Sequence, residues 1–283
     1  MKKVDFMVIG APKCGTTSLC KYLARHPEIS FSNPKEPNYF NFRHDKISLE
    51  EYHDLFGNKP EKLWGEGSVQ YSDWPHIFNT HKRIFDYNKN MKFIFIMRHP
   101  IDRIVSEYLY NKSRRLIKYD DFFNEVVRNA QYVRRSRYYT QLLPFLKTFK
   151  REQFCLLFFE DLRDNYEKVL EQLSQFLSIN LGLFGDSAAI HENKSNPSIQ
   201  VGNSIFRKIL KTGITKFVPP TFKKSIKANF FKTESRPNIF PELHQFFLNE
   251  LIADIEYLEK LMGLKLDYWK SNTGGYNENT INN

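Results

Sequence analysis

Gly10-Ala-Pro-Lys13-Cys-Gly15-Thr16-Thr17-Ser18 directly follows an apolar run at residues 4–9 and opens a pattern with helical spacing. A strand, a glycine loop and a helix in this order present backbone N–H groups and the positive end of a helix to a phosphate group. The glycines let the backbone approach such a ligand closely. This stretch therefore predicts an anion-binding loop at the carboxyl end of a first β-strand.

The position of the lysine separates this loop from the common nucleotide-binding pattern GxxxxGK followed by Ser or Thr. Gly10, Gly15 and Thr17 fit that pattern. Thr16 stands where the pattern has its lysine, and a lysine occurs earlier in the loop, at Lys13. A cation placed there meets the end of the ligand from another side. This indicates a transferable group other than the γ-phosphoryl group of ATP.

A second motif follows the apolar run Phe93-Ile-Phe-Ile-Met97, which ends in a fixed cation, Arg98. In P-loop NTPases the corresponding strand ends in an aspartate that helps to hold Mg²⁺. An arginine fork with a nearby hydroxyl, Ser106 on the helix that Pro100 opens, suits a phosphate monoester instead. The motif predicts a second phosphate site and disfavours metal-bound triphosphate chemistry, so we expect a reaction without a metal ion.

Short apolar or aromatic runs alternate with amphipathic helical patterns along this chain of 283 residues. Such alternation is typical of βαβ units and a parallel sheet. The predicted strands are residues 4–9, 29–31, 93–97 and 154–159, and the clearest predicted helices are 101–109, 142–149, 166–177 and 242–262. We expect an α/β fold with a single domain over residues 1–270 and an unstructured tail at 271–283.

Basic residues outnumber acidic ones, with 42 Lys and Arg against 32 Asp and Glu, so the formal net charge is +10. Residues 207–236 alone hold nine basic residues and one acidic residue. Such a run binds an anionic partner, for example an anionic polymer or membrane surface, or is a solvated face. Nucleic acid is not expected, because none of the usual nucleic-acid-binding signatures accompanies the run.

Features of the whole chain bear on its location. The three cysteines form neither a disulfide framework nor a zinc-binding spacing. No apolar run approaches the roughly 18 residues that span a bilayer, and the first residues lack the pattern of a signal peptide. These features predict a cytoplasmic protein, and the basic run is compatible with peripheral association with a membrane.

Together the two phosphate motifs resemble those of sulfotransferases that use 3′-phosphoadenosine 5′-phosphosulfate (PAPS). The stretch from Gly10 to Leu19 is similar to their 5′-phosphosulfate loop, and the stretch from Arg98 to Ser106 to their 3′-phosphate motif. The resemblance continues through residues 159–162 and 258–263. It implies a P-loop NTPase-like three-layer α/β sandwich around a central parallel sheet, with PAPS as co-substrate at the carboxyl ends of the strands.

The resemblance also implies which residues contact PAPS. The implied contacts are Lys13, Cys14, Gly15, Thr16, Thr17, Ser18, Arg98 and Ser106. Residues 190–197 are similar to a late family loop that closes over the nucleotide, which makes Lys194 a candidate contact with the 3′-phosphate. Arg207 is another such candidate. Lys13 is also the cation expected at the bridging oxygen of the leaving phosphate.

Sulfuryl transfer needs a base that takes the proton of the acceptor hydroxyl. The cytosolic, small-molecule branch of the family uses a His in a Lys-Ser-His-like segment, and this chain has no such segment. The Golgi heparan-type and related bacterial carbohydrate branch uses a Glu in a loop after the second strand, which resembles Pro34-Lys35-Glu36-Pro37-Asn38-Tyr39-Phe40 here. The resemblance therefore points to Glu36. Many glycosaminoglycan sulfotransferases have a lysine at the position of Gly67 and often a histidine at that of Asn38, and these differences weaken the case for a heparan-like acceptor.

The sequence thus favours an O-sulfotransferase that moves a sulfuryl group from PAPS to a hydroxyl of a carbohydrate or glycolipid, without a metal. A P-loop kinase or NTPase is one alternative, and Lys13, Thr16 and Arg98 disfavour it. A non-catalytic protein that binds anionic glycans through residues 207–236 is the other. That alternative would leave the phosphate loop without a purpose.

Overall fold

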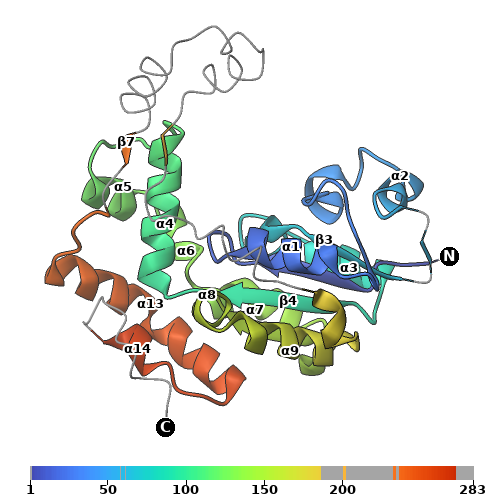
Figure 1. Ribbon diagram of the computed structural model, residues 1–283. Helices are drawn as coiled ribbons and strands as arrows, with labels where there is room; N and C mark the ends of the chain where they lie inside the picture. The colour runs from blue at the N-terminus through green and yellow to red at the C-terminus, as the bar shows by residue number, and fades with distance from the viewer. Residues whose placement is uncertain are drawn as a thin grey trace, which may run out of the picture.

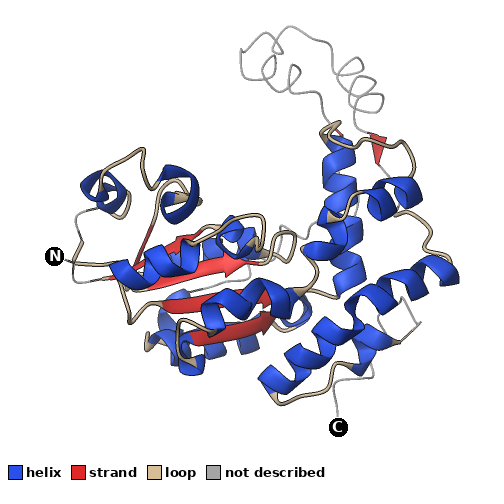
Figure 2. Cartoon of the chain, turned by 180° about the vertical axis from the view of Figure 1, so that it is seen from behind, coloured by secondary structure: helices blue, strands red, loops and turns tan. Residues whose placement is uncertain are grey.

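The computed structural model describes residues 2–57, 59–60, 62–185, 200–201, 232–233 and 236–271 of the chain. Five parallel strands form a central sheet in the order β2-β3-β1-β4-β5, and their arrowheads point to the same side in Figure 2. These strands are β1 (Phe6–Gly10), β2 (Ile29–Phe31), β3 (Leu63–Gly67), β4 (Lys92–Met97) and β5 (Phe154–Phe158). A separate antiparallel pair joins β6 (Gln200–Val201) to β7 (Lys232–Thr233).

Helices cover both faces of the central sheet (Figure 1). The helices packed on the sheet are α1 (Thr16–Arg25), α3 (Thr80–Tyr87), α7 (Tyr138–Leu146) and α9 (Tyr166–Leu177). The connection through α1 runs along the sheet in one direction, and the connections through α3 and α7 run in the other. Crossovers between parallel strands are right-handed. The helix α1 therefore lies on the face of the sheet opposite to α3 and α7. Ring contacts agree with this arrangement, since Tyr22 of α1 stacks on Tyr166 of α9, whereas His81 of α3 lies beside Phe145 of α7. The predicted three-layer α/β fold is confirmed.

A second group of helices stands at the carboxyl ends of the strands, on the left of Figure 1. It consists of α4 (Pro100–Ser113), α5 (Phe122–Arg128), α6 (Gln131–Arg134), α13 (Pro241–Met262) and α14 (Asp267–Lys270). Trp269 of α14 is buried and contacts the rings of Tyr138 and Phe158, which joins this group to the sheet. The remaining short helices are η1 (Tyr39–Arg43), α2 (Leu49–Asp54), η2 (Val69–Ser72), η3 (Arg151–Gln153), α8 (Phe159–Asp164) and η4 (Leu181–Phe184).

Most elements with a strong apolar pattern form where the sequence predicts them. The four predicted strands correspond to β1, β2, β4 and β5, and the four clearest helices to α4, α7, α9 and α13. Gly263 ends α13 in the left-handed conformation, with φ 68°, as expected of a C-cap glycine. β3 was not predicted. The predicted tail lies outside the described residues after Ser271.

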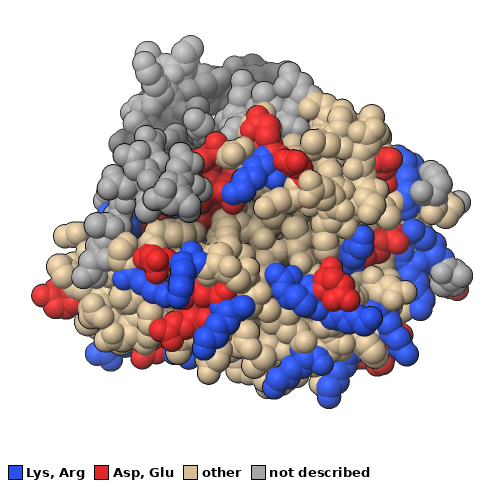
Figure 3. Space-filling model, turned by 90° about the horizontal axis from the view of Figure 1, so that it is seen from below, with Lys and Arg blue, Asp and Glu red and all other residues tan. Residues whose placement is uncertain are grey.

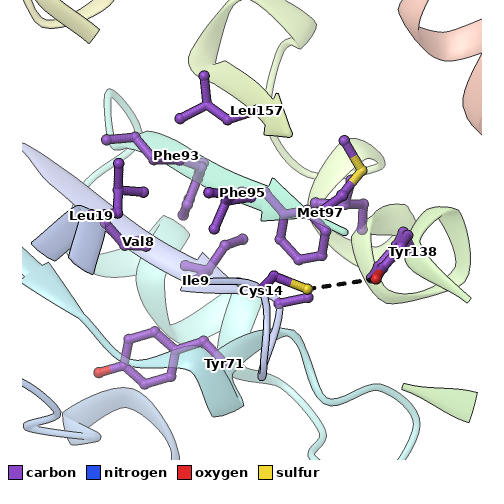
Figure 4. Packing of buried hydrophobic residues seen from close by; sticks show 14 of the residues in the cluster. Val8, Ile9, Cys14, Leu19, Tyr71, Phe93, Phe95, Met97, Tyr138 and Leu157 are labelled. Atoms are coloured by element: carbon purple, nitrogen blue, oxygen red, sulfur yellow. Dashed lines mark hydrogen bonds between the residues drawn. The ribbon is translucent and has the colours of Figure 1, made fainter. Parts of the chain in front are cut away.

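Aromatic packing on β4 fixes the strands that carry the two phosphate motifs (Figure 4). The Phe93 ring centroid lies 5.3 Å from that of Phe145, and the Phe95 centroid 6.1 Å from that of Tyr138. A Cβ atom at Gly10 would lie 2.5 Å from the Phe95 ring, so β1 can approach β4 here only with a glycine. Burying each such ring contributes about 1.5–3 kcal/mol. In the described ranges no helix is both long and apolar enough to cross a membrane.

Candidate active site

The turn from β1 into α1 is built around two residues in the left-handed conformation. Lys13 has φ 70° and Gly15 has φ 83°. Residues other than glycine rarely adopt such angles, and those that do cluster at ligand-binding sites. A side chain at position 15 would place its Cβ atom 2.6 Å from the Phe159 ring, so this position requires glycine. The turn brings Lys13 and the start of α1 to the carboxyl edge of the sheet.

The first turn of α1 offers free backbone donors. Gly15 precedes the helix, and no side chain caps the N–H groups that follow it. Thr16 is buried, Ser18 is half-buried and Thr17 is exposed. Uncapped N–H groups at the positive end of a helix dipole favour a phosphate group. This helix start therefore fits the 5′-phosphate of a nucleotide.

Cys14 faces inward, away from this helix start. Its thiol is fully buried, and burial raises its pKa to about 12. Its Sγ atom lies 3.5 Å from the Tyr138 hydroxyl (Figure 4), and its N–H donates to the Ala11 carbonyl at 3.3 Å. The Cys14 side chain therefore packs inside the loop, and a contact of this residue with the donor stays a prediction.

Tyr138, which the sequence analysis did not single out, joins the two phosphate motifs. Its buried hydroxyl donates a hydrogen bond to the Arg98 carbonyl at 2.7 Å and lies 3.3 Å from the Arg98 N–H. The same hydroxyl contacts Cys14 of the loop. One buried phenol thus fixes the distance between the loop after β1 and the residue that ends β4.

Arg98 extends from the carboxyl end of β4, the neighbour of β1 in the sheet. Its guanidinium carbon lies 4.7 Å from the centroid of the Phe159 ring. Its Nε atom is buried and has no hydrogen-bond partner among the described residues. A buried guanidinium donor without a partner fits an anionic ligand. Ser106 is half-buried on α4, the helix that follows Arg98.

A buried carboxylate holds the turn after Arg98. The His99 N–H donates to Oε1 of Glu160 at 3.0 Å. Burial raises the pKa of Glu160, and burial lowers the pKa of His99 to about 4. The imidazole is therefore neutral near pH 7, and Arg98 supplies the positive charge at this end of β4.

Lys13 lies among several charged groups. Burial lowers the pKa of its ammonium group to about 8. Glu107 opposes this shift, whereas three guanidinium groups add to it, those of Arg103, Arg114 and Arg98. The Nζ atom lies 3.8 Å from the centroid of the Tyr110 ring. Near neutral pH most molecules carry a protonated Lys13, so its ammonium group can stabilise negative charge that develops on a leaving oxygen.

Glu107 belongs to a buried chain of ion pairs that the sequence analysis missed. Arg103 and Arg135 approach its carboxylate at 2.8 and 2.7 Å. Arg135 also binds Asp73 at 2.8 Å, and Arg134 binds Asp73 at 2.6 Å. Burial alone would raise the pKa values of Glu107 and Asp73. These arginines outweigh it and hold both pKa values below their usual range. Both acids are therefore charged at neutral pH, and the chain connects α4 with α6 and the segment after β3.

Glu36, the predicted base, lies on the loop after β2 and is exposed. The Nζ atom of Lys35 lies 2.8 Å from its Oε1. The end of β3 holds this loop, because the Gly67 N–H donates to the Lys35 carbonyl at 3.3 Å. The Asn38 N–H donates to Oγ of Ser68 at 3.1 Å. Since β2 and β3 are parallel to β1 and β4, Glu36 reaches the same edge of the sheet as Lys13.

The glycine at position 67 has a steric reason. A Cβ atom there would lie 2.5 Å from Sγ of Cys20 on α1 and 3.6 Å from Cε of Lys35. A lysine side chain at this position therefore has no room, and the ammonium group nearest to Glu36 comes from Lys35 instead.

Glu66 is a buried carboxylate behind the Glu36 loop. It accepts hydrogen bonds from the hydroxyls of Tyr52 at 2.7 Å, Tyr71 at 3.0 Å and Ser68 at 2.7 Å. Burial outweighs these three donors and raises its pKa to about 7. Because Ser68 also binds the backbone of the Glu36 loop, Glu66 fixes that loop from inside the protein.

Two predicted donor contacts, Lys194 and Arg207, lie outside the described residues. The basic run at 207–236 is described only at β7 and at Arg236. The guanidinium group of Arg236 pairs with the carboxylate of Asp102 in the first turn of α4. The last cation of the run therefore lies close to the turn that carries Arg98.

Residues 3–219 match the family described as sulfotransferase domain. Carbohydrate sulfotransferase 15 of Mus musculus is 27% identical over 267 residues, which cover 68% of this chain and 46% of that protein. Membrane-associated sulfotransferase kil1 of Dictyostelium discoideum is 37% identical over 113 residues, which cover 38% of this chain and 23% of that protein. This chain thus spans less than half the length of these relatives.

A solved structure has a similar fold. The crystal structure of a sulfotransferase from Alicyclobacillus acidocaldarius matches with a TM-score of 0.69 and 21% sequence identity, over 96% of this chain and 100% of that one. At this identity the likeness shows the arrangement of helices and strands alone.

Proposed function

We propose that this chain, which belongs to the sulfotransferase domain family, moves a sulfuryl group from PAPS to a hydroxyl group of a carbohydrate. One observation carries the proposal. The phosphate loop with Lys13 and the residue Arg98, whose buried Nε has no partner among the described residues, directly follow two adjacent strands. Tyr138 joins them, because its hydroxyl contacts Cys14 of the loop and donates to the Arg98 carbonyl. Two cationic sites at a fixed distance, with an uncapped helix start beside the first, suit a donor with phosphate groups at both its 5′ and 3′ positions.

Each side of this arrangement has a proposed role toward the donor. PAPS supplies the sulfuryl group and a phosphate leaving group. The backbone N–H groups of residues 15–18 hold the 5′-phosphate, and Arg98 with Ser106 holds the 3′-phosphate. Lys13 donates to the bridging oxygen, where the electron pair of the broken sulfur–oxygen bond comes to rest.

Glu36 is the proposed base. As the acceptor oxygen forms its bond to sulfur, its O–H bond breaks and the proton passes to the Glu36 carboxylate. The Lys35 ammonium group already binds this carboxylate at 2.8 Å. Because Lys35 binds Oε1, the other carboxylate oxygen, Oε2, can take the proton of the acceptor hydroxyl.

The acceptor class is proposed from the relatives. Carbohydrate sulfotransferase 15 is named for a carbohydrate acceptor, and a free or lipid-linked glycan fits the exposed position of Glu36.

In the view from below (Figure 3), basic and acidic side chains are intermixed over the surface. The role of residues 207–236 in binding an anionic partner stays a prediction. Lys194 and Arg207 remain proposed contacts with the 3′-phosphate, and the cytoplasmic location remains a prediction.

Nucleotide binding tests the proposed function directly. Titration calorimetry should show that the product 3′-phosphoadenosine 5′-phosphate (PAP) binds and that Mg-ATP does not. Transfer of radiolabelled sulfate from PAPS to a panel of glycans should proceed equally well in EDTA. Binding of Mg-ATP in place of PAP would support a P-loop kinase or NTPase, and binding of neither would support a non-catalytic glycan-binding protein.

A further inference from the structure

The ring of Tyr110 lies against the lysine of the phosphate loop. Nζ of Lys13 is 3.8 Å from the centroid of the ring, and the guanidinium carbon of Arg114 is 4.5 Å from the same centroid. An ammonium group at this distance is attracted by the negative face of the ring, most strongly when it is shielded from water. Tyr110 thus meets the proposed catalytic cation through its ring.

The position of Tyr110 on α4 follows from helical spacing. Arg103, Glu107, Tyr110 and Arg114 recur every three or four residues, so they form one stripe along α4. All four act on Lys13, either through charge or through the ring. The face of α4 that carries this stripe is therefore directed to the loop after β1.

We propose that Tyr110 is a positioning residue for Lys13, whose ring holds the charged ammonium group at the place where the leaving phosphate develops its negative charge. This inference rests on the proposed sulfuryl transfer. Within the described part of the chain, the hydroxyl of Tyr110 has no hydrogen-bond partner, so the ring rather than the hydroxyl performs this role.

The charges around Lys13 explain why a ring is needed. Burial favours the neutral amine, and the guanidinium groups of Arg98, Arg103 and Arg114 repel an ammonium group. Glu107 attracts it, but this carboxylate is shared with Arg103 and Arg135. The ring adds an attraction that does not come from a carboxylate, and Lys13 lies closer to the ring centroid than Arg114 does. It therefore favours the protonated form of Lys13 and restricts where its Nζ can lie.

Replacing the ring tests this inference. Tyr110→Phe keeps the ring and should retain the parent turnover. Tyr110→Leu removes it, and kcat at neutral pH should fall about tenfold, as expected for the loss of one shielded cation–π contact. Because the ring stabilises the protonated lysine, the loss of kcat at alkaline pH should begin at lower pH in Tyr110→Leu. PAP affinity should change by less than about threefold, because the helix start and Arg98 are intact.

The matched control is Tyr257→Leu on α13. Tyr257 also has a lysine near its ring, with Nζ of Lys260 at 5.5 Å from the centroid, and its side chain is 53% exposed. Its removal should leave kcat and its pH profile unchanged. If Tyr110→Leu fails to fold, fluorinated phenylalanines at position 110 provide the test, because fluorine weakens the ring's attraction for cations at nearly constant shape. The logarithm of kcat should then fall with each added fluorine.

The outcomes separate this inference from the function on which it rests. A parent protein that neither binds PAP nor transfers sulfate refutes the proposed function. The role of Tyr110 is refuted if the parent is active and Tyr110→Leu leaves both kcat and its decline at alkaline pH unchanged. It is also refuted if neither quantity responds to fluorination.

Discussion

Lys13 and Glu36 occupy the same edge of the sheet but have different surroundings. Lys13 lies between a strained turn, the Tyr110 ring and a chain of buried ion pairs. Glu36 is exposed, and its carboxylate binds its sequence neighbour, Lys35. The structure therefore fixes the proposed donor cation from several sides, whereas the proposed base is held by the backbone of its loop and by one neighbouring ammonium group, that of Lys35.

The specificity for each substrate therefore has a different structural origin. Fixed charges and dipoles stabilise a developing charge without reorganising during the reaction, which suits a donor that is always the same molecule. Exposed loops on a rigid scaffold vary without loss of the core, which suits acceptors that differ between relatives. Variants on the two sides should therefore fail in different ways.

The largest effect is expected on the donor side, from Lys13→Ala. This change removes the cation at the leaving oxygen, so kcat should fall about 10³-fold, as for the loss of one donor to a developing oxyanion. PAP affinity should change far less, since the helix start still binds the 5′-phosphate. Stopped assays with radiolabelled PAPS and calorimetry with PAP measure the two quantities. Lys21→Ala, an exposed lysine on α1, is the control, and equal losses in both variants would contradict the assignment.

On the acceptor side, Glu36→Gln keeps the shape of the side chain and removes the proton acceptor. We expect kcat to fall about 10²-fold with PAP binding nearly unchanged, because a positioned base contributes about 10² to 10⁴ in rate. The control is Glu50→Gln, an exposed glutamate on α2. A Glu36→Gln variant that turns over a true acceptor at the parental rate would remove Glu36 from the mechanism.

Arg98→Ala should weaken the binding of the donor rather than the chemical step. Charge-assisted hydrogen bonds contribute about 1.5–3 kcal/mol, so the Kd of PAP should rise about 10- to 100-fold. At saturating PAPS, kcat should fall much less than in Lys13→Ala. Calorimetry measures the affinity, with Arg25→Ala, an exposed arginine on α1, as the control. An unchanged Kd would show that Arg98 does not contact the 3′-phosphate.

The donor side was more predictable than the acceptor side because its signals are local in sequence. The strand, glycine loop and helix after Gly10 are contiguous, and Arg98 directly follows a strongly apolar strand. Tyr138 could not be predicted in the same way. It acts through contacts with Cys14, 124 residues away, and with Arg98, 40 residues away, and nothing in its own segment marks it.

The acceptor side depends on β3, which has no strand signal. Two of its five residues are glycines, including the central Gly65, and between them stands the acidic Glu66 rather than an apolar residue. A Cβ atom at Gly65 would lie 2.1 Å from the Phe6 ring, so tertiary packing requires the residue that weakens the local pattern. The hydroxyls that satisfy Glu66 come from three other positions, Tyr52, Ser68 and Tyr71, so neither the strand nor its buried carboxylate could be inferred from alternation alone.

The smallest expected effect concerns Glu66, which supports the Glu36 loop through Ser68. Its pKa in the folded protein is about 7, raised by burial above the ordinary value of 4.5. Between these two values the folded form keeps a proton that the unfolded form has lost, so this group stabilises the fold most at low pH. Its contribution declines as the pH rises through about 7. Glu66→Gln cannot titrate, and its stability should lack this decline.

Denaturant unfolding of the parent and of Glu66→Gln from pH 4.5 to 7 measures the difference. The parent's free energy of unfolding, relative to that of the variant, should fall by about 1 kcal/mol for each pH unit in this window. Glu50→Gln, whose carboxylate is exposed, should follow the parent. Parallel stability curves for the parent and Glu66→Gln would mean that Glu66 is ionised throughout. In that case the loop of the proposed base would rest on a permanently buried charge, and the two sides of the site would be alike in this respect.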